Sequence, residues 1–153
     1  MPSRREAILA DALLSLEAIG GGSYLTAPRT RARELPVALD DLTAMAFPAL
    51  FVAGAGEEKE RLDSEQIVSR LQVEVRGFLR RQARPAISGP PLSAQINDLI
   101  ADVERALAAD ETRGQNASST TPVAVEVDES TFDEIAGFLA RFEVQYSYPF
   151  GDP

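Results

Sequence analysis

The sequence predicts an α/β (α+β) fold: a single mixed, largely antiparallel sheet of four to five strands with two amphipathic helices packed on one face. Two segments, near residues 4–19 and 92–109, repeat apolar side chains at the spacing of one helix face. Two others, 67–80 and 138–148, alternate apolar and polar residues as half-buried strands do. The apolar stripes of the helices need a surface, and the apolar faces of these strands supply it.

At 153 residues, of which 44% are hydrophobic, the chain is long enough to bury a core. We predict one domain spanning residues 1–153, with flexible connectors near 54–66 and 110–122. No apolar run reaches about 18 residues, so we expect no membrane-spanning helix. Glu6, Asp11 and Glu17 interrupt the apolar positions near the N-terminus, so we expect no secretory signal there.

The first helix is predicted over Arg4–Ile19. Ser3 and Glu6 are spaced as a capping box, in which each side chain satisfies a backbone donor at the helix start. Gly20–Gly22 then stop the helix. Because these glycines follow a helix and precede no Lys-Ser/Thr pair, a helix stop explains them better than a phosphate-binding loop.

The next stretch predicts short elements. Tyr24–Arg33 is expected to be a strand broken by a proline, with three arginines on one side that form a solvated edge or a strip that binds a partner. Leu35–Ala46 suits a short helix. Phe47–Ala53 suits a buried strand that ends at Gly54–Gly56.

Glu57–Glu65 is dense in charge and is expected to form a solvated loop. Ile67–Arg80 is long for a strand, and we predict that it protrudes as one arm of an extended hairpin. Gly77 is expected to mark a bulge or bend in it. The basic end of this strand predicts a phosphate-contact cluster or one side of a subunit contact. Its cations are Arg76, Arg80, Arg81 and Arg84.

The second helix is predicted over Leu92–Ala109, after a linker at Pro85–Pro91. Asp98 and Asp102 lie one turn apart on this helix, as paired carboxylates for a divalent cation would. The sequence places no third acidic ligand beside them. A solvated helix face is therefore the expected explanation.

Asp110–Pro122 is polar and is expected to be a flexible loop. Residues 123–127 alternate valine with other residues, which predicts a strand, and residues 128–135 should form a turn or bulge. The last strand, Phe138–Tyr148, carries an aromatic face toward the helices. Pro149 ends it because proline has no N–H to donate, and a short aromatic and acidic tail follows.

The chain contains neither cysteine nor histidine. It therefore lacks disulfides, thiolate metal sites and the commonest general base. We expect no enzymatic activity, no catalytic or metal-binding residues and no cofactor. The net charge of −9 disfavours tight binding of DNA over a broad surface, which leaves a local basic patch as the alternative.

Several features follow one another across nearly the whole chain. An N-terminal helix with a glycine stop precedes the strand Phe47–Val52, an acidic connector and the long strand Leu71–Gly77. The helix Leu92–Leu107 and the ending, Phe142–Tyr146 with Gly151–Pro153, complete the series. In this order they resemble the tail terminator (tail completion) proteins of long-tailed bacteriophages, the minor tail protein family of lambda-like siphophages.

The resemblance implies a hexameric ring that caps the head-proximal end of the tail tube, stops tube polymerisation and joins the tail to the head connector. The implied partners are further copies of the chain, the tail tube protein and the neck proteins. DNA would pass through the ring without specific binding. The implied location is the virion tail or neck, and the host cytoplasm during assembly.

The family has no fixed catalytic residues to transfer, so the interface residues come from this sequence alone. A head-to-tail ring uses heterologous contacts, and we expect basic side chains of one subunit to meet acids of the next. The candidate interface residues are Arg29, Arg31, Arg76, Arg80, Arg81, Asp128, Glu129, Asp133, Glu134, Arg141 and Glu143. Acids of the connector are expected to line the channel or to form a docking loop. They are Glu57, Glu58, Glu60, Asp63 and Glu65.

Another neck protein of the virion, such as a head-completion or adaptor subunit, fits the same features because it is also a small acidic ring-former. A small carboxylate-dependent metal enzyme and a regulatory binding module are the alternatives from other classes. Clustered acids with bound metal would indicate the enzyme, and a monomer or dimer would indicate the binding module.

Overall fold

The computed structural model describes residues 1–35, 42–63, 65–81, 90–128 and 135–153. Its elements include two α-helices, one 3₁₀ helix and five strands. In chain order they are α1 (Arg4–Glu17), β1 (Thr30–Ala32), the 3₁₀ helix η2 (Ala44–Ala46), β2 (Ala49–Arg61), β3 (Gln66–Arg80), α2 (Leu92–Ala108), β4 (Ser119–Asp128) and β5 (Ile135–Pro149).

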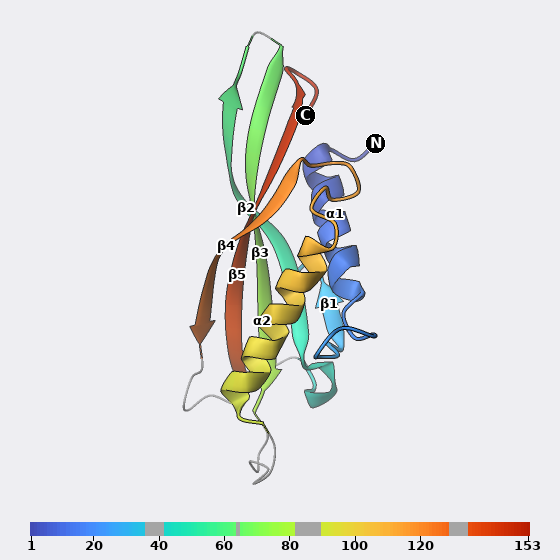
Figure 1. Ribbon diagram of the computed structural model, residues 1–153, viewed down its shortest axis with the longest axis vertical. Helices are drawn as coiled ribbons and strands as arrows, with labels where there is room; N and C mark the ends of the chain where they lie inside the picture. The colour runs from blue at the N-terminus through green and yellow to red at the C-terminus, as the bar shows by residue number, and fades with distance from the viewer. Residues whose placement is uncertain (36–41, 64, 82–89, 129–134) are drawn as a thin grey trace.

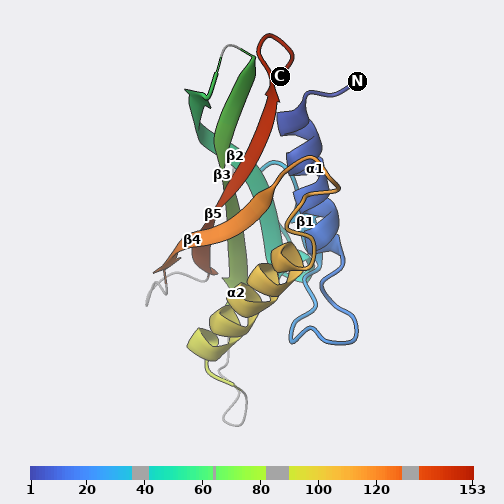
Figure 2. The ribbon, with the colours of Figure 1, turned by 45° about the horizontal axis from the view of Figure 1, so that its top comes forward.

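The strands form one five-stranded mixed sheet in the order β1-β2-β3-β5-β4. β1 runs parallel to β2, and every other pair of neighbours is antiparallel. Both α-helices lie on the same face of this sheet (Figures 1 and 2). The predicted fold class is confirmed.

The centre of the sheet is the ladder between β3 and β5, which stay in register from Gln66 opposite Pro149 to Arg80 opposite Ile135. The even-numbered residues of β5 from Ala136 to Tyr148 are buried and pack in the same core as α1 and α2. The aromatic face predicted for the last strand therefore packs against the helices. The period of 2 along each strand decides this, because a shift by one residue would turn the whole face to solvent.

The two α-helices end within two residues of their predicted limits. Ser3 caps α1 by accepting a hydrogen bond from the Glu6 amide at 3.2 Å. The Glu6 carboxylate does not complete the predicted capping box, because it binds Arg33 at 2.7 Å instead. The apolar stripe of α2 is buried as predicted, and it includes Ile96, Leu99, Val103 and Leu107.

β2 is longer than predicted. It passes through Gly54 and Gly56 with a bulge between Gly54 and Glu57, and it continues to Arg61. The expectation of a loop over Glu57–Glu65 is therefore wrong for its first half. The charged residues there did not indicate a strand, because their partners lie on neighbouring strands and not nearby in sequence. With β3 and the end of β5, this part of β2 forms an arm that projects beyond the helices (Figure 1).

Three other connections differ from expectation. Of the strand predicted over Tyr24–Arg33, the residues near its end form β1 (Thr30–Ala32). The flexible loop predicted over Asp110–Pro122 is a series of turns followed by the first residues of β4. Of the short helix predicted over Leu35–Ala46, the structure shows the turn η2, and residues 36–41 lie outside the described part. Most of the linker predicted before α2 lies outside it too.

Gly77 and Gly137 lie opposite aromatic residues of the neighbouring strand, Phe138 and Phe78 respectively. A Cβ atom at Gly77 would overlap the Phe138 ring, and one at Gly137 would lie 3.0 Å from the Gly77 carbonyl oxygen. Pairing of β3 with both of its neighbours continues through Gly77. The expected bulge or bend is therefore wrong, and the glycine makes room for an aromatic ring on the helix side of the sheet.

We expect Gly77→Ala to destabilise the fold by about 1–3 kcal/mol, because the added methyl group must displace the buried Phe138 ring. Gly56→Ala is the matched control, since no heavy atom lies within 4 Å of the Cβ position there. Urea unfolding of both variants checks this. Equal midpoints for the two variants would contradict the packing described.

Candidate functional site

Among the described residues, no group of three or more acidic, histidine or cysteine side chains is placed to hold a metal ion. No helix in the described part of the chain is both long enough and apolar enough to cross a lipid bilayer. The polar side chains instead gather at three places inside the fold and over several exposed surfaces.

The first place is Asp102 on α2. Its side chain is fully buried and accepts hydrogen bonds from the Leu25 amide at 2.9 Å and from the amide and hydroxyl of Thr26 at 2.7 and 2.6 Å. Arg105 donates to it at 2.8 Å. The solvated helix face predicted for both aspartates is therefore wrong for Asp102, whereas Asp98 is exposed. Asp102 holds the loop after α1 against α2.

The second place is the base of the arm, where Glu57 joins three elements. Its side chain is only 8% exposed. It accepts hydrogen bonds from Arg5 of α1 at 3.1 Å, from Ser69 of β3 at 2.5 Å and from the Tyr146 hydroxyl of β5. Lys59 lies 3.6 Å from Glu57. Glu57 was expected to line a channel or to form a docking loop. In the structure its carboxylate binds side chains of three neighbouring elements of the same chain.

The charge of Glu57 is stabilised by these contacts. Burial alone would raise the pKa of Glu57, but hydrogen bonds from Ser69 and Tyr146 and the charges of Lys59 and Arg5 outweigh it, so the pKa is lowered. Burial, reinforced by the hydrogen bond to Glu57, raises the pKa of Tyr146. The tyrosine therefore stays a donor and the glutamate an acceptor.

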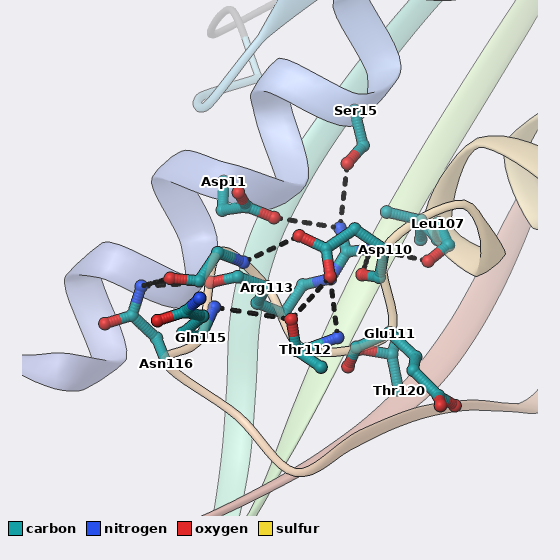
Figure 3. Close-up of polar contacts among 11 residues, drawn as sticks. Asp11, Ser15, Leu107, Asp110, Glu111, Thr112, Arg113, Gln115, Asn116 and Thr120 are labelled. Carbon is teal, nitrogen blue, oxygen red and sulfur yellow. Dashed lines mark hydrogen bonds and ion pairs between the residues drawn. The ribbon is translucent and has the colours of Figure 1, made fainter.

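The third place is the turn after α2, shown in Figure 3. Arg113 is fully buried and donates to the Leu107 carbonyl at 2.5 Å, to the Ser15 hydroxyl at 2.9 Å and to the Asp110 carbonyl. It also forms an ion pair with Asp11 of α1 at 3.3 Å. The side chain thus fastens the turn to both α-helices.

Asp110 stabilises this turn through hydrogen bonds from the residues that follow it. Its carboxylate accepts hydrogen bonds from the Thr112 hydroxyl at 2.6 Å and from the Gly114 amide at 2.8 Å, and these contacts lower the pKa of Asp110. Burial lowers the pKa of Arg113, against the opposing charges of Asp11 and Asp110. Burial raises the pKa of Asp11 despite the charge of Arg113. These contacts hold residues 110–116 in a series of turns where the sequence predicted a flexible loop.

Several candidate interface arginines are engaged within the chain. Arg31 donates to the Ile19 carbonyl at 2.5 Å, while Arg29 is exposed and its guanidinium lies 3.6 Å from the Met45 sulfur. On the sheet face away from the helices, Arg141 contacts Glu126 at 3.1 Å and Glu74 at 3.6 Å.

The same outer face carries Arg76, which lies 3.6 Å from Glu74, and Glu143, which is half-buried. Arg80 and Arg81 are exposed at the end of β3. Asp128 is exposed at the end of β4, on the same end of the sheet. Three predicted interface acids, Glu129, Asp133 and Glu134, lie outside the described residues.

The other acids expected to line a channel lie near the tip of the arm. Glu58, Glu60 and Glu65 are exposed, and Asp63 caps the turn by accepting from the Glu65 amide at 2.8 Å and the Gln66 amide at 3.0 Å. Glu60 lies 3.6 Å from Arg70.

The C-terminal tail joins this tip. The Phe150 amide donates to the Glu65 carbonyl at 2.8 Å, and the Arg61 guanidinium lies 4.2 Å from the centre of the Phe150 ring. Phe150 and Leu62 are both exposed. Two segments far apart in sequence thus form one acidic and apolar tip.

Sequence reasoning missed one further surface. Val123, Val125 and Val127 form the predicted strand, but they are 55%, 38% and 47% exposed. They lie on β4, at the edge of the sheet, with β5 as its only neighbouring strand among the described residues. The alternation of valine was a sufficient signal for a strand, but it did not show that residues 121–128 of this strand are exposed.

Comparison with models of known protein families finds no match to this chain, and comparison with curated proteins finds none either.

Glu57→Gln should lower the free energy of unfolding at pH 7 by about 1–3 kcal/mol, because a charged acceptor of several hydrogen bonds is lost. The folded pKa of Glu57 is depressed, so its stabilisation is complete above its ordinary value of 4.5 and is lost as the pH falls through the folded pKa. Unfolding by urea at pH 7 and below pH 4.5 should show the difference between wild type and variant shrinking with acid. The exposed neighbour Glu58→Gln is the control and should change little at either pH; a constant difference for Glu57→Gln would contradict the assignment.

Arg113→Met should destabilise the fold by about 1–3 kcal/mol. The methionine fills a similar volume but leaves the Leu107 carbonyl without the guanidinium donor and Asp11 without its ion-pair partner. Thermal unfolding monitored by circular dichroism measures the effect, with the exposed Arg29→Met as control. Unchanged stability of Arg113→Met would show that the buried guanidinium does not hold the turn.

Proposed function

We propose that this chain is a non-enzymatic structural subunit of a bacteriophage tail terminator, which forms a hexameric ring at the head-proximal end of the tail tube. There it ends tube polymerisation and offers a surface to the head connector. The observation that carries the proposal is the three-stranded arm: it projects beyond the helices and ends in an exposed tip that combines acids with apolar side chains (Figure 1).

The arm is built as a rigid extension of the sheet. Its strands pair as far as Arg61 opposite Ile67 and Gln66 opposite Pro149. Glu57 ties its base to α1, and Lys59 donates to the Tyr148 hydroxyl at 2.7 Å. A tip held in this way is suited to docking on a neighbouring ring, because little conformational freedom is lost on binding.

The charges of the chain fit a ring through which DNA passes. The net charge is −9, and the exposed acids of the arm would repel the DNA backbone rather than bind it. The proposed contact between neighbours joins the basic end of β3 to acids of the next subunit, such as Asp128. Both groups lie at the same end of the sheet, so this contact would form between subunits that stand side by side.

Another ring protein of the neck is the second candidate, because the same arm would serve an adaptor subunit. The two differ in position. A terminator contacts the last ring of the tail tube, and its loss gives tails that are overlong or not joined to heads.

The first test is the assembly of the purified protein and the effect of the arm tip. Negative-stain images should show rings with a central channel. Leu62→Asp combined with Phe150→Asp should leave the rings intact, because both side chains are exposed on the tip, yet give unjoined or overlong tails when it replaces the wild-type chain in the phage that encodes it. Leu14→Asp, at an exposed apolar position on α1, is the control and should give normal tails. A protein that stays monomeric at all concentrations, or tails of normal length and joining with the tip variant, would overturn the proposal.

A further inference from the structure

We propose that the arms of neighbouring copies of this chain pack side by side, with a cationic flank of one arm against an acidic flank of the next. The cationic flank comprises Arg4, Lys59 and Arg61, and the acidic flank comprises Glu58, Glu60 and Glu143. The inference rests on the proposed function only in that it names a subunit contact of the ring.

The two flanks arise from the alternation of side chains along β2. Glu57 lies opposite Leu71, which belongs to the main core, so Glu57 points to the helix side of the sheet. Residues two apart share a face of a strand, so Lys59 and Arg61 point to the same side. The Glu57 side chain is buried against its partners, whereas the Lys59 side chain is 44% exposed and Arg61 is exposed. The charges that the outer half of β2 exposes on this side are therefore cations.

Arg4, in the first turn of α1, adds a further cation to this side. It is exposed, and it donates to the Ser147 carbonyl of β5 at 2.5 Å. Lys59 donates to the hydroxyl of the next residue, Tyr148, at 2.7 Å. Burial lowers the pKa of Lys59, but the hydrogen bond to Tyr148 and the charge of Glu57 outweigh it, so the pKa is raised. Arg4 and Lys59 thus approach one short stretch of β5, and both are charged at pH 7.

The outer side of the same length of the arm is acidic. Glu58 and Glu60 stand on either side of Lys59 in the sequence and therefore point away from the helices. Both are exposed, and Glu60 lies 3.6 Å from Arg70. Glu143 of β5 is half-buried on the same side. The three carboxylates outweigh the single charge of Arg70, so this flank is acidic on balance.

A second copy in the same orientation is the occupant that this charge pattern selects. Successive residues lie about 3.3 Å apart along a strand, so Glu58 and Glu60 lie at nearly the same height on the arm as Lys59. A neighbouring arm that stands level with the first therefore brings its two acids opposite Lys59 without any shift along the arm. Complementary charges of this kind fix the register and orientation of partners. The chain carries both halves of the contact at one height.

The contact joins two unlike surfaces, so it is heterologous and repeats from one copy to the next around an axis. It keeps all copies in one orientation, as the side-by-side contact proposed for the basic end of β3 also does. The arm and that basic end lie at opposite ends of the sheet, so two separate contacts would hold each neighbour in place (Figure 1). Asp63 and Glu65 lie beyond the arm contact, at the turn, and stay exposed at the tip.

The test exchanges the charges of the two flanks. Arg4→Glu with Lys59→Glu makes both flanks acidic, and Glu58→Lys with Glu60→Lys makes both cationic. Each double variant alone should assemble more weakly than the wild type by about tenfold or more, because like charges then meet at the contact. Light scattering after size exclusion and native mass spectrometry measure the assembly.

The matched control is Glu17→Lys with Glu111→Lys, at exposed positions near the end of α1 and in the turn after α2. It changes the net charge as much as the second double variant does, and it should assemble as the wild type does. Lys59→Arg keeps the charge of the cationic flank and should also assemble normally. Circular dichroism shows whether each variant is folded. Arg4→Gln with Lys59→Gln should also weaken assembly, and it replaces the first double variant if that variant is unfolded.

An equimolar mixture of the two charge-exchanged double variants is the decisive measurement. The acidic flanks of one variant then meet the cationic flanks of the other, so assembly should return with the two variants alternating. Native mass spectrometry, which separates the variants by mass, should find equal numbers of each in the ring. A mixture that stays dissociated although both variants are folded would overturn the arm contact.

The outcomes separate the two proposals. Double variants that each assemble as the wild type does would overturn the arm contact and leave the ring function standing. A wild-type chain that is monomeric at all concentrations would overturn both, and binding of a short DNA duplex by that monomer would assign the cationic flank to nucleic acid. Open filaments that the double variants dissociate and their mixture restores would support the arm contact and overturn the ring.

Discussion

The antiparallel ladder between β3 and β5 is the constraint on which the rest of the structure depends. Both strands are 15 residues long and stay in register from end to end. Their register decides which side chains reach α1 and α2. At one end of the ladder Phe138 lies opposite Gly77 and Phe78 lies opposite Gly137. At the other end the ladder extends beyond the helices as part of the arm. β2 and β4 are each placed by pairing with one of these two strands.

The buried charged groups depend on this scaffold, and two of them stabilise segments outside the helices and strands. Asp102 fixes the loop after α1, and Arg113 fixes the turn after α2. Glu57 fixes the base of the arm. Each accepts or donates several hydrogen bonds within the chain, as a buried charge requires, although the buried Nε of Arg113 has no partner among the described residues. Asp102, which the sequence offered as one of two paired carboxylates for a cation, therefore has a structural role here.

The sequence predicts the elements whose pattern is local. α1, α2, β3 and β5 follow from periodicity, because each repeats its buried positions along one segment. The outer half of β2 could not be predicted in this way. Glu57 and Lys59 have polar partners on β3 and β5, and these contacts exist only once the strands pair. The burial of Arg113 and the exposure of Val125 could not be predicted for the same reason. Both depend on where elements that are distant in sequence end.

The two edges of the sheet differ in what covers them. An open apolar edge invites aggregation, and proteins protect such edges with covering strands, bulges and charges. Here the β2 edge carries β1, a bulge and charges, whereas β4, with a bulge and the acids Glu126 and Asp128, exposes Val125 and Val127 and has β5 as its neighbouring strand among the described residues. Contacts between unlike surfaces generate rings or open filaments, and closure into a ring requires that the rotation between neighbours divide a full turn. The proposed ring therefore needs two different surfaces of the chain that meet with such a rotation, as the basic end of β3 and the acids of a neighbouring subunit are proposed to do.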